Sequence, residues 1–292
     1  MRIRTCVALA LSTLCALAFA GTAAQAQRNR DESGINWQVG PGIGQLGEIA
    51  QIRIPDEYRF AGKEGVRRFM ELTQNPVSGS ELGVLIPSEQ SGGEWFVVFD
   101  FNSVGYVKDD EKNKLDATAI LESIKEGTRH SNEERRKRGW AEMEILGWHT
   151  PPRYSQMTNN LTWAIRGSSE GSEVVNYSVR LLGRRGVMDA DLVLNPTQVI
   201  TAVPEFDQLL TGFEFKSGSR YSEFTTGDKV AAYGLTALVA GGAGAALAKS
   251  GLLGKLWKLL VFGAVAALAA VKRVLAAVFG KKQTDTPASS PS

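Results

Sequence analysis

The longest uncharged stretch of the chain, from Val230 to Ala248, constrains the fold more than any other feature. Its nineteen residues lie between Lys229 and Lys249 and include four glycines, which weaken helices in water but are common in membrane-spanning ones. At about 1.5 Å per residue, a helix of this length matches the roughly 30 Å hydrocarbon layer of a bilayer. A phosphate-binding loop is excluded, because no Gly-Lys-Ser/Thr sequence ends the stretch. The stretch therefore predicts a transmembrane helix over residues 229–249.

The residues around this helix predict its orientation and its packing. Lys249, Lys255 and Lys258 crowd its far end, and basic residues accumulate on the cytoplasmic side of membrane helices. Small residues recur every four positions and leave a smooth stripe that suits close helix packing. The stripe consists of Ala237, Gly241 and Ala245. It serves either a homo-oligomer or contact with the next apolar segment.

That next segment, Leu256–Val271, lies within residues 250–280 and has basic residues at both ends. Thirteen residues from Leu259 onward are apolar, which is short for a membrane span. A full span would also place Lys272 outside the cytoplasm, against the charge rule. A second span, a re-entrant piece and an interfacial helix all stay open, and a second membrane-embedded helix is favoured. Residues 281–292 predict a disordered tail.

The N-terminus has the pattern of a secretory signal peptide over residues 1–26. A short basic start precedes an apolar run, and Ala24 and Ala26 provide the small residues of a cleavage site. An uncleaved N-terminal anchor is the alternative. Cys6 and Cys15 both lie inside this segment, so the mature chain would contain no thiol. Cysteine nucleophiles, thiolate metal sites and disulfides are then excluded.

Charge divides the chain into two parts. Residues 27–228 carry 23 Lys and Arg against 30 Asp and Glu, whereas the chain from Lys229 onward carries 8 basic residues and one acidic residue. The acidic part lacks the positive field that nucleic-acid binding requires. Together with the signal peptide and the basic flank, this asymmetry predicts an inner-membrane protein whose main domain faces the periplasm.

The predicted periplasmic domain, residues 27–228, has the pattern of an α+β fold. Leu115–Arg138 is typical of a long helix. Three runs of alternating apolar residues follow, from Leu161, Val175 and Met188, and glycine-containing turns separate them. They predict a three-stranded antiparallel meander, and residues 213–224 predict a final hairpin. We therefore expect an antiparallel sheet with flanking helices, plus one or two C-terminal transmembrane helices.

Two short motifs match patterns of known sites but lie in the wrong context. Gly42–Gly47 reads GIGQLG, a dinucleotide-binding pattern, yet a strand pattern follows it where that site needs a helix. Gly167–Gly171 reads GSSEG, a hydrolase pattern, yet Ser169 falls between two predicted strands. Neither motif predicts a site.

The titratable residues offer few catalytic sets. His130 lies in a charged helix, while His149 is flanked by Trp148 and two prolines. The two histidines lack metal-site spacing. Asp189 and Asp191 lie two residues apart on a predicted strand, and the alternation places both on its solvent-exposed face.

Three segments resemble a known family: GWHTPPRYSQMTNNLTWAI, VNYSVRLLGRRGVM and GSRYSEFTTGDKVAAYGLTALVAGGAGA. They are similar to the bacterial uncharacterised membrane-anchored proteins, which are defined by a domain of unknown function. The resemblance runs from about Gln38 to Lys258 and implies an exported domain on a C-terminal membrane segment. It implies no established activity. The residues that carry it include Trp148, Tyr154, Asn176, Arg180, Arg184 and Asp228.

The sequence favours a membrane-anchored periplasmic binding protein of the bacterial envelope that requires no cofactor or metal. The expected partners are the lipid bilayer, an unidentified envelope protein or component and a further copy of the chain, and no nucleic acid. The candidate binding residues are Trp148, His149, Tyr154, Asn176, Arg180 and Arg184. One alternative is an envelope enzyme, hydrolase-like, that uses His149 with Arg184 or Asp189. Another is a structural membrane component that oligomerises through its glycine-rich helix.

Overall fold

The structure, a computed structural model, describes residues 33–73, 75, 77–88 and 93–240. The predicted signal peptide, residues 241–249 of the predicted transmembrane helix, the second apolar segment and the tail lie outside these residues. Over the ranges that are described, no helix combines the length and the apolar character needed to cross a membrane.

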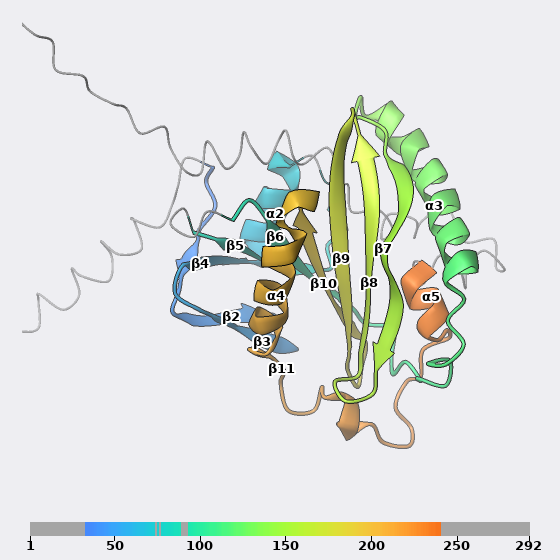
Figure 1. The fold of residues 1–292 in the computed structure, drawn as a ribbon. Helices are drawn as coiled ribbons and strands as arrows, with labels where there is room; N and C mark the ends of the chain where they lie inside the picture. Colours follow the sequence, from blue (N-terminus) through green and yellow to red (C-terminus); the bar gives the residue numbers. More distant parts are fainter. Residues whose placement is uncertain (1–32, 74, 76, 89–92, 241–292) are drawn as a thin grey trace, which may run out of the picture.

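Two antiparallel sheets form the framework (Figure 1). The large sheet has eight strands in the order β1-β4-β5-β6-β10-β9-β8-β7. The bounds of its strands are Gln38–Val39 (β1), Tyr58–Gly62 (β4), Glu81–Pro87 (β5), Phe96–Asn102 (β6), Glu144–Ser155 (β7), Asn160–Ser169 (β8), Ser172–Leu182 (β9) and Val187–Leu194 (β10). The small sheet has the order β11-β3-β2, with Gly42–Leu46 (β2), Ala50–Ile54 (β3) and Phe213–Phe215 (β11).

Within the described residues, four α-helices and two short 3₁₀ helices accompany the sheets. The α-helices are Lys63–Leu72 (α2), Ala117–Lys137 (α3), Val199–Leu210 (α4) and Leu235–Ala240 (α5), and the 3₁₀ helices are Pro196–Gln198 (η2) and Tyr221–Glu223 (η3). Helix α3 begins where the Asp116 side chain accepts hydrogen bonds from the backbone amides of Thr118 and Ala119. The predicted long helix is thereby confirmed.

The predicted meander is confirmed as β8, β9 and β10, which are neighbours in the large sheet. Strands β8 and β9 are joined by Glu170 and Gly171, whose φ angles are 49° and 77°. Two positive φ angles define the turn that matches the twist of a two-residue hairpin. The predicted final hairpin over residues 213–224 is wrong: β11 pairs with β3, and the following residues form η3.

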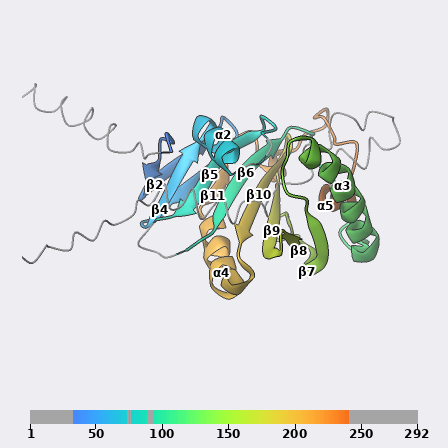
Figure 2. The same cartoon turned by 90° about the horizontal axis from the view of Figure 1, so that it is seen from above.

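Both faces of the large sheet are covered (Figure 2). The small sheet and α4 pack on one face, around a core that includes Ile52, Phe99 and Phe206. Helix α2 covers one end of the opposite face, and α3 with α5 covers the other end (Figures 1 and 2). We call this second face, covered by α2, α3 and α5, the helical face.

Residues 229–240 pack on the domain, although the sequence assigned them to the start of a transmembrane helix. Val230 forms a β-bridge with Tyr106. Leu235 in α5 is fully buried in a cluster that contains Ile120 of α3 and Trp163 of β8. The folded domain therefore continues past residue 228 to Ala240, because apolar side chains in this part of the stretch find a protein surface to cover.

Candidate functional site

A charged cluster lies in the middle of the helical face. Strand β10 is buried along its whole length, and the residues that point to this face are Val187, Asp189, Asp191 and Val193. The two valines belong to the apolar cores under α3 and α2, so the two aspartates lie between these cores. The prediction of solvent exposure is wrong, since Asp189 is 8% exposed and Asp191 only 1%. The alternation predicted that this face would contact solvent, but α2, α3 and α5 cover it.

The neighbouring strand β9 supplies the cation of the cluster. Arg180 lies opposite Asp189 in the register, with its Nε 3.0 Å from Asp189 Oδ1 and its Nη1 2.9 Å from Asp191 Oδ1. Ser178 Oγ donates to the same Asp191 oxygen at 2.6 Å. The Arg180 guanidinium also lies 4.7 Å from the centre of the Trp163 ring, a cation–π distance. Burial lowers the pKa of Arg180, but Asp189 and Asp191 outweigh it and raise this pKa above the ordinary value.

The other neighbouring strand, β6, adds a third aspartate. Asp100 lies directly opposite Asp189, and Ser80 Oγ donates to Asp100 Oδ1 at 2.5 Å. Asn102 Nδ2 donates to Asp189 Oδ2 at 2.7 Å. Burial raises the pKa of Asp100 well above its usual range, and the negative charges around it add to this effect.

A fourth carboxyl group comes from β5, where the pairing with β6 shifts between Glu81 and Gly83. A bulge of this kind redirects a side chain, and Glu81 here lies opposite Asp100. Glu81 accepts hydrogen bonds from the Ser78 amide and hydroxyl and from the Gly79 amide, at 2.6, 2.7 and 2.8 Å. Its oxygens are thus satisfied by the loop that precedes β5. We call Glu81, Asp100, Arg180, Asp189 and Asp191 the acidic cluster.

The acidic cluster is not arranged as a metal site. Among the described residues, no group of three or more His, Cys, Asp or Glu side chains is placed to hold a metal ion. Arg180 occupies the position between Asp189 and Asp191 that a cation would take. What distinguishes the cluster is its charge, with four buried carboxyl groups and one guanidinium, which pairs with Asp189 and Asp191. Burial raises the pKa of Asp189 to about 7, although Arg180 opposes this shift.

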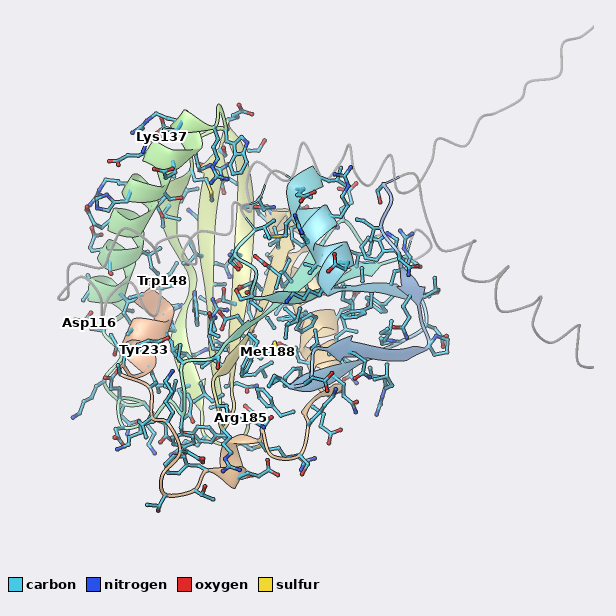
Figure 3. The ribbon with its side chains drawn as sticks, turned by 180° about the vertical axis from the view of Figure 1, so that it is seen from behind. Asp116, Lys137, Trp148, Arg185, Met188 and Tyr233 are labelled. Carbon is cyan, nitrogen blue, oxygen red and sulfur yellow. The ribbon has the colours of Figure 1, made fainter. Side chains whose placement is uncertain are left out.

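The C-terminal strap, defined as residues 216–240, passes close to this cluster. Its Tyr233 is half-buried, and burial, reinforced by the negative charge of Asp189, raises the Tyr233 pKa to about 12. Figure 3 shows Tyr233 beside α5, on the helical face of the sheet. The negative charge of Asp189 therefore acts on a side chain of the strap.

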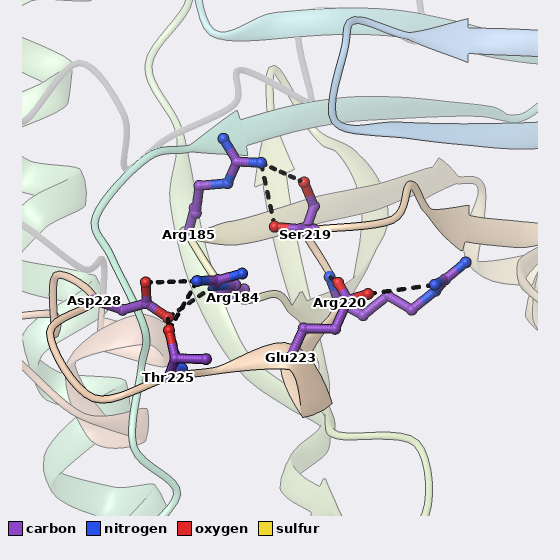
Figure 4. A network of polar contacts seen from close by, with 8 residues as sticks. Arg184, Arg185, Ser219, Arg220, Glu223, Thr225 and Asp228 are labelled. Atoms are coloured by element: carbon purple, nitrogen blue, oxygen red, sulfur yellow. Dashed lines mark hydrogen bonds and ion pairs between the residues drawn. The ribbon is translucent and has the colours of Figure 1, made fainter.

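An ion pair fastens the strap to the turn between β9 and β10 (Figure 4). Arg184 Nε donates to Asp228 Oδ2 at 2.7 Å, and Arg184 Nη2 donates to Asp228 Oδ1 at 2.9 Å. The Thr225 amide donates to Asp228 Oδ2 at 2.8 Å. The hydrogen bond from Arg184, followed by that from Thr225, lowers the pKa of Asp228 below its usual range. We call Arg184 with Asp228 the arginine clamp.

Aromatic rings and backbone hydrogen bonds hold the strap beside the clamp. The Tyr106 ring stacks on Tyr221 and Phe224, with ring centres 4.4 and 4.1 Å away. The Tyr221 hydroxyl donates to the Val107 carbonyl at 3.0 Å. The Arg184 amide also donates to the Ser219 carbonyl at 2.9 Å. The strap is thus attached at several independent points.

Glu111 fixes the beginning of α5. Its Oε2 accepts from the Thr236 amide at 2.8 Å, which satisfies a free amide in the first turn of the helix. A Cβ atom at Gly234 would lie 2.6 Å from the Glu111 carboxyl group, so a larger residue here would displace the Glu111 side chain that caps the helix.

The structure separates the six predicted binding residues into four places. Arg180 lies in the acidic cluster, and Asn176 on the same strand lies near it, with its Oδ1 3.5 Å from Ser178 Oγ. Arg184 belongs to the clamp. Tyr154 is half-buried near the strap: burial raises its pKa, as do Asp109 and Tyr106 to a smaller degree. These residues therefore do not form one binding site.

The remaining two predicted residues lie on β7, at the edge of the sheet. Trp148 donates from Nε1 to the Ala117 carbonyl at 3.0 Å and packs against the core under α3. His149 is exposed, and its Nδ1 lies 3.1 Å from Oγ1 of Thr150 on the same strand. Because β7 and β10 are three strands apart, about 14 Å separates their backbones. The structure does not bring His149 together with Asp189 or Arg184.

The short motifs and His130 have structural roles. Gly42–Leu46 forms β2, and Ser169 Oγ, at the end of β8, donates to the Glu142 carbonyl at 2.6 Å. His130 Nε2 lies 3.2 Å from Glu126 Oε1, one helical turn away on α3. The sequence analysis missed Glu81 and Asp100. The signal for Asp100 was a lone carboxylate within the apolar run of β6.

Comparison with known proteins gives one clear match. The family model described as "Protein of unknown function (DUF2167)" matches residues 38–272. No curated protein matches the sequence. Three solved structures are similar over part of their length: the cyanobacterial PsbP (CyanoP) of Synechocystis sp. PCC 6803, protein PA94 of Pseudomonas aeruginosa, a putative regulator, and the immunity protein TplEi of the Pseudomonas aeruginosa T6SS.

These structural similarities are weak. The identities are 13%, 12% and 10%, and the TM-scores are 0.34, 0.23 and 0.26, in the order given above. The matches cover 61%, 57% and 68% of this chain, and 96%, 91% and 83% of the other chains. At these TM-scores the similarities carry no inference about function.

Proposed function

Because the chain belongs to the DUF2167 family of proteins of unknown function, we propose a role from its own geometry: a membrane-anchored binding protein of the bacterial envelope. Its domain would face the periplasm and bind a protein or envelope component. Apolar residues beyond Ala240 would hold it at the inner membrane. The signal-peptide pattern, the acidic domain and the basic residues after the apolar stretch support this orientation.

The attachment of the strap is the observation that carries the proposal. Four kinds of contact hold residues 216–240: the arginine clamp, the stack on Tyr106, the β-bridge at Val230 and the cap that Glu111 gives α5. The apolar stretch continues directly from α5. An anchor within residues 241–272 would leave at most fifteen residues between α5 and the membrane-embedded part, so the domain would be held close to the bilayer surface. This suits a binding protein that acts at the membrane.

The location of α5 changes the expected anchor. If α5 stays on the domain, only residues 241–248 of the first apolar stretch are free to enter the bilayer, which is too short for a span. The second apolar segment, Leu256–Val271, would then be required for attachment. The proposal therefore places the membrane-embedded part within residues 241–272, and not at residues 229–249.

A truncation tests the anchor. Full-length protein and a chain that ends after Ala240 would be expressed, and membranes would be washed with alkaline carbonate. We expect the full-length chain to stay with the membranes and the truncated chain to be released in folded form with the periplasmic fraction. A phosphatase fusion at residue 240 should be active. Release of the full-length chain, or an inactive fusion, would contradict the proposal.

Crosslinking in cells tests the binding role. A photo-crosslinking residue would replace exposed apolar side chains at different places on the domain, such as Met157 at 93% exposure and Ile200 at 88%. A binding protein should give a defined adduct from one face and none from the others. Glu173, exposed on β9, is the control position. Absence of adducts from every face would contradict a binding role, and an adduct of twice the chain mass would favour oligomerisation through Ala237, Gly241 and Ala245.

A further inference from the structure

The acidic cluster has buried oxygen atoms that lack donors. Asp100 Oδ2, Asp189 Oδ1 and Asp191 Oδ2 receive no hydrogen bond from the residues that the structure describes. Asp189 Oδ1 lies near Arg180 Nε, but without hydrogen-bond alignment. A buried acceptor without a donor is costly, and three in one cluster require an explanation.

The register brings these carboxyl groups close together. Asp189 and Asp100 are direct cross-strand partners, so their Cβ atoms lie about 4.5–5.5 Å apart. Two carboxyl groups at such a distance in a buried site do not both stay ionised. Asp191 is stabilised by Arg180 and Ser178. Glu81 is stabilised by hydrogen bonds from the loop that precedes β5. Among the residues that the structure describes, Asp100 accepts a hydrogen bond from the Ser80 hydroxyl alone.

We propose that the acidic cluster is a proton-binding site, in which Asp100 and Asp189 together hold one proton at neutral pH. The proton resides on Asp100 Oδ2, because Asp100 Oδ1 already accepts from Ser80 and no cation pairs with Asp100 among the described residues. Asp100 then becomes a donor to the carboxylate oxygens that face it. One proton thereby removes a buried negative charge and supplies a missing donor.

The electrostatics of the cluster support this assignment. Burial raises the pKa of Asp100 well above its usual range, and burial raises that of Asp189 to about 7. The charged and titratable groups that face the pair are Glu81 on β5, Asp191 on β10, Arg180 on β9 and Tyr233 of the strap. Glu81 and Asp191 set two carboxyl groups against the one guanidinium of Arg180, so the charged groups around the pair favour proton uptake, while Tyr233 is neutral near pH 7.

Proton uptake makes stability depend on pH in a direction that can be worked out. The unfolded aspartates titrate near pH 4, whereas the folded pair keeps its proton to about pH 7 or above. Between these values the folded state binds more protons than the unfolded state. Stability therefore falls as pH rises through this window, and the unfolding equilibrium constant rises about tenfold per pH unit for each proton.

A spectroscopic measurement on the full-length protein tests the site directly. Infrared spectra at pH 7 should contain the C=O stretch of a neutral carboxylic acid, and Asp100→Asn should remove it. The variant Glu173→Gln, which changes an exposed carboxylate on β9, should leave it unchanged. A wild-type spectrum without a neutral carboxyl band at pH 7 would overturn the proposal, whether or not Asp100→Asn folds.

Chemical denaturation of the full-length protein, followed by tryptophan fluorescence between pH 4.5 and 7, gives a second measure. Wild type and Glu173→Gln should lose stability as the pH rises, and their unfolding equilibrium constants should increase by up to about tenfold per pH unit. Asp100→Asn and Asp189→Asn should each make stability depend less on pH, because an amide donates a hydrogen bond without taking up a proton from solution. Equal slopes in all four proteins, or stability that rises with pH in the wild type, would overturn the proposal.

Discussion

Two arginine–aspartate pairings have their arginines on the β9–β10 hairpin, and their carboxyl groups differ in the direction of their pKa shifts. In the arginine clamp, the pKa of Asp228 lies below its usual range. In the acidic cluster, the pKa of Asp189 is raised to about 7, although Arg180 is in contact with it. The two arginines lie only four residues apart on the chain.

The difference comes from burial and from the number of acids that share one cation. The Asp228 side chain is 20% exposed and has Arg184 to itself, with further donors from Thr225. The Asp189 side chain is 11% exposed and shares Arg180 with Asp191. Desolvation of a carboxylate in the sheet outweighs the attraction of one shared guanidinium. An ion pair therefore does not by itself predict the direction of a pKa shift.

Removal of the shared cation should have the largest effect. Arg180→Met would leave the buried Asp189 and Asp191 without a cation, and we expect a loss of about 3–5 kcal/mol of unfolding free energy at pH 7.5. The loss should be smaller at pH 5, because the aspartates can then take up protons. Chemical denaturation at pH 7.5 and at pH 5 measures the loss of unfolding free energy under each condition.

Arg180→Lys is the matched control for this prediction. Lysine keeps the positive charge but cannot contact two carboxylates at once as the guanidinium fork does. It should therefore lose less stability than Arg180→Met at pH 7.5. If Arg180→Met were equally unstable at both pH values, the loss would come from packing against Trp163, and the comparison between the two pairings would be wrong.

The strap connects the two pairings, so its release should affect them unequally. In Gly234→Val the new side chain would meet the Glu111 carboxyl group, and we expect α5 to detach with a loss of about 1–3 kcal/mol. Water would then reach Tyr233 and the acidic cluster, and the pKa of Asp189 should fall toward its usual value. Hydrogen exchange should become fast at Leu235–Ala240 and stay slow in β10.

Ala232→Val is the control for the strap, since Ala232 is exposed two residues earlier. It should change neither the exchange of α5 nor the titration of Asp189. If Gly234→Val detached α5 while the Asp189 pKa stayed near 7, the strands and α2 alone would keep the cluster dry. The strap would then have no influence on the pKa of Asp189.

The same contrast shows what the sequence could predict. Alternation and turn residues identified β8, β9 and β10, because cross-strand pairing in a meander is local in the chain. Alternation also showed correctly that Asp189 and Asp191 share a face. It could not show that this face is buried, because its cover comes from α2, α3 and α5, more than forty residues away in sequence. The partner Asp100, on β6, is also distant in sequence from Asp189.

The apolar stretch after Lys229 shows a second limit. A charge-free run of nineteen residues fits a bilayer and a protein core equally well, and composition alone does not choose between them. Its first part packs on α3 because Glu111 caps α5 and Gly234 permits close approach. Those contacts depend on tertiary structure. The clamp was likewise visible only as two residues, Arg184 and Asp228, more than forty positions apart.

The smallest expected effect, from Asp228→Asn, has a pH dependence that distinguishes the clamp from the cluster. Because the folded-state pKa of Asp228 is lowered, its carboxylate adds stability above about pH 4 and loses this contribution as the pH falls further. The variant should therefore be slightly less stable than wild type, by a constant amount, from pH 5 to 8, and the two should converge below pH 4. Denaturation curves across this range measure the difference. A gap that widens toward acidic pH would mean that Asp228 is not held as an anion by Arg184.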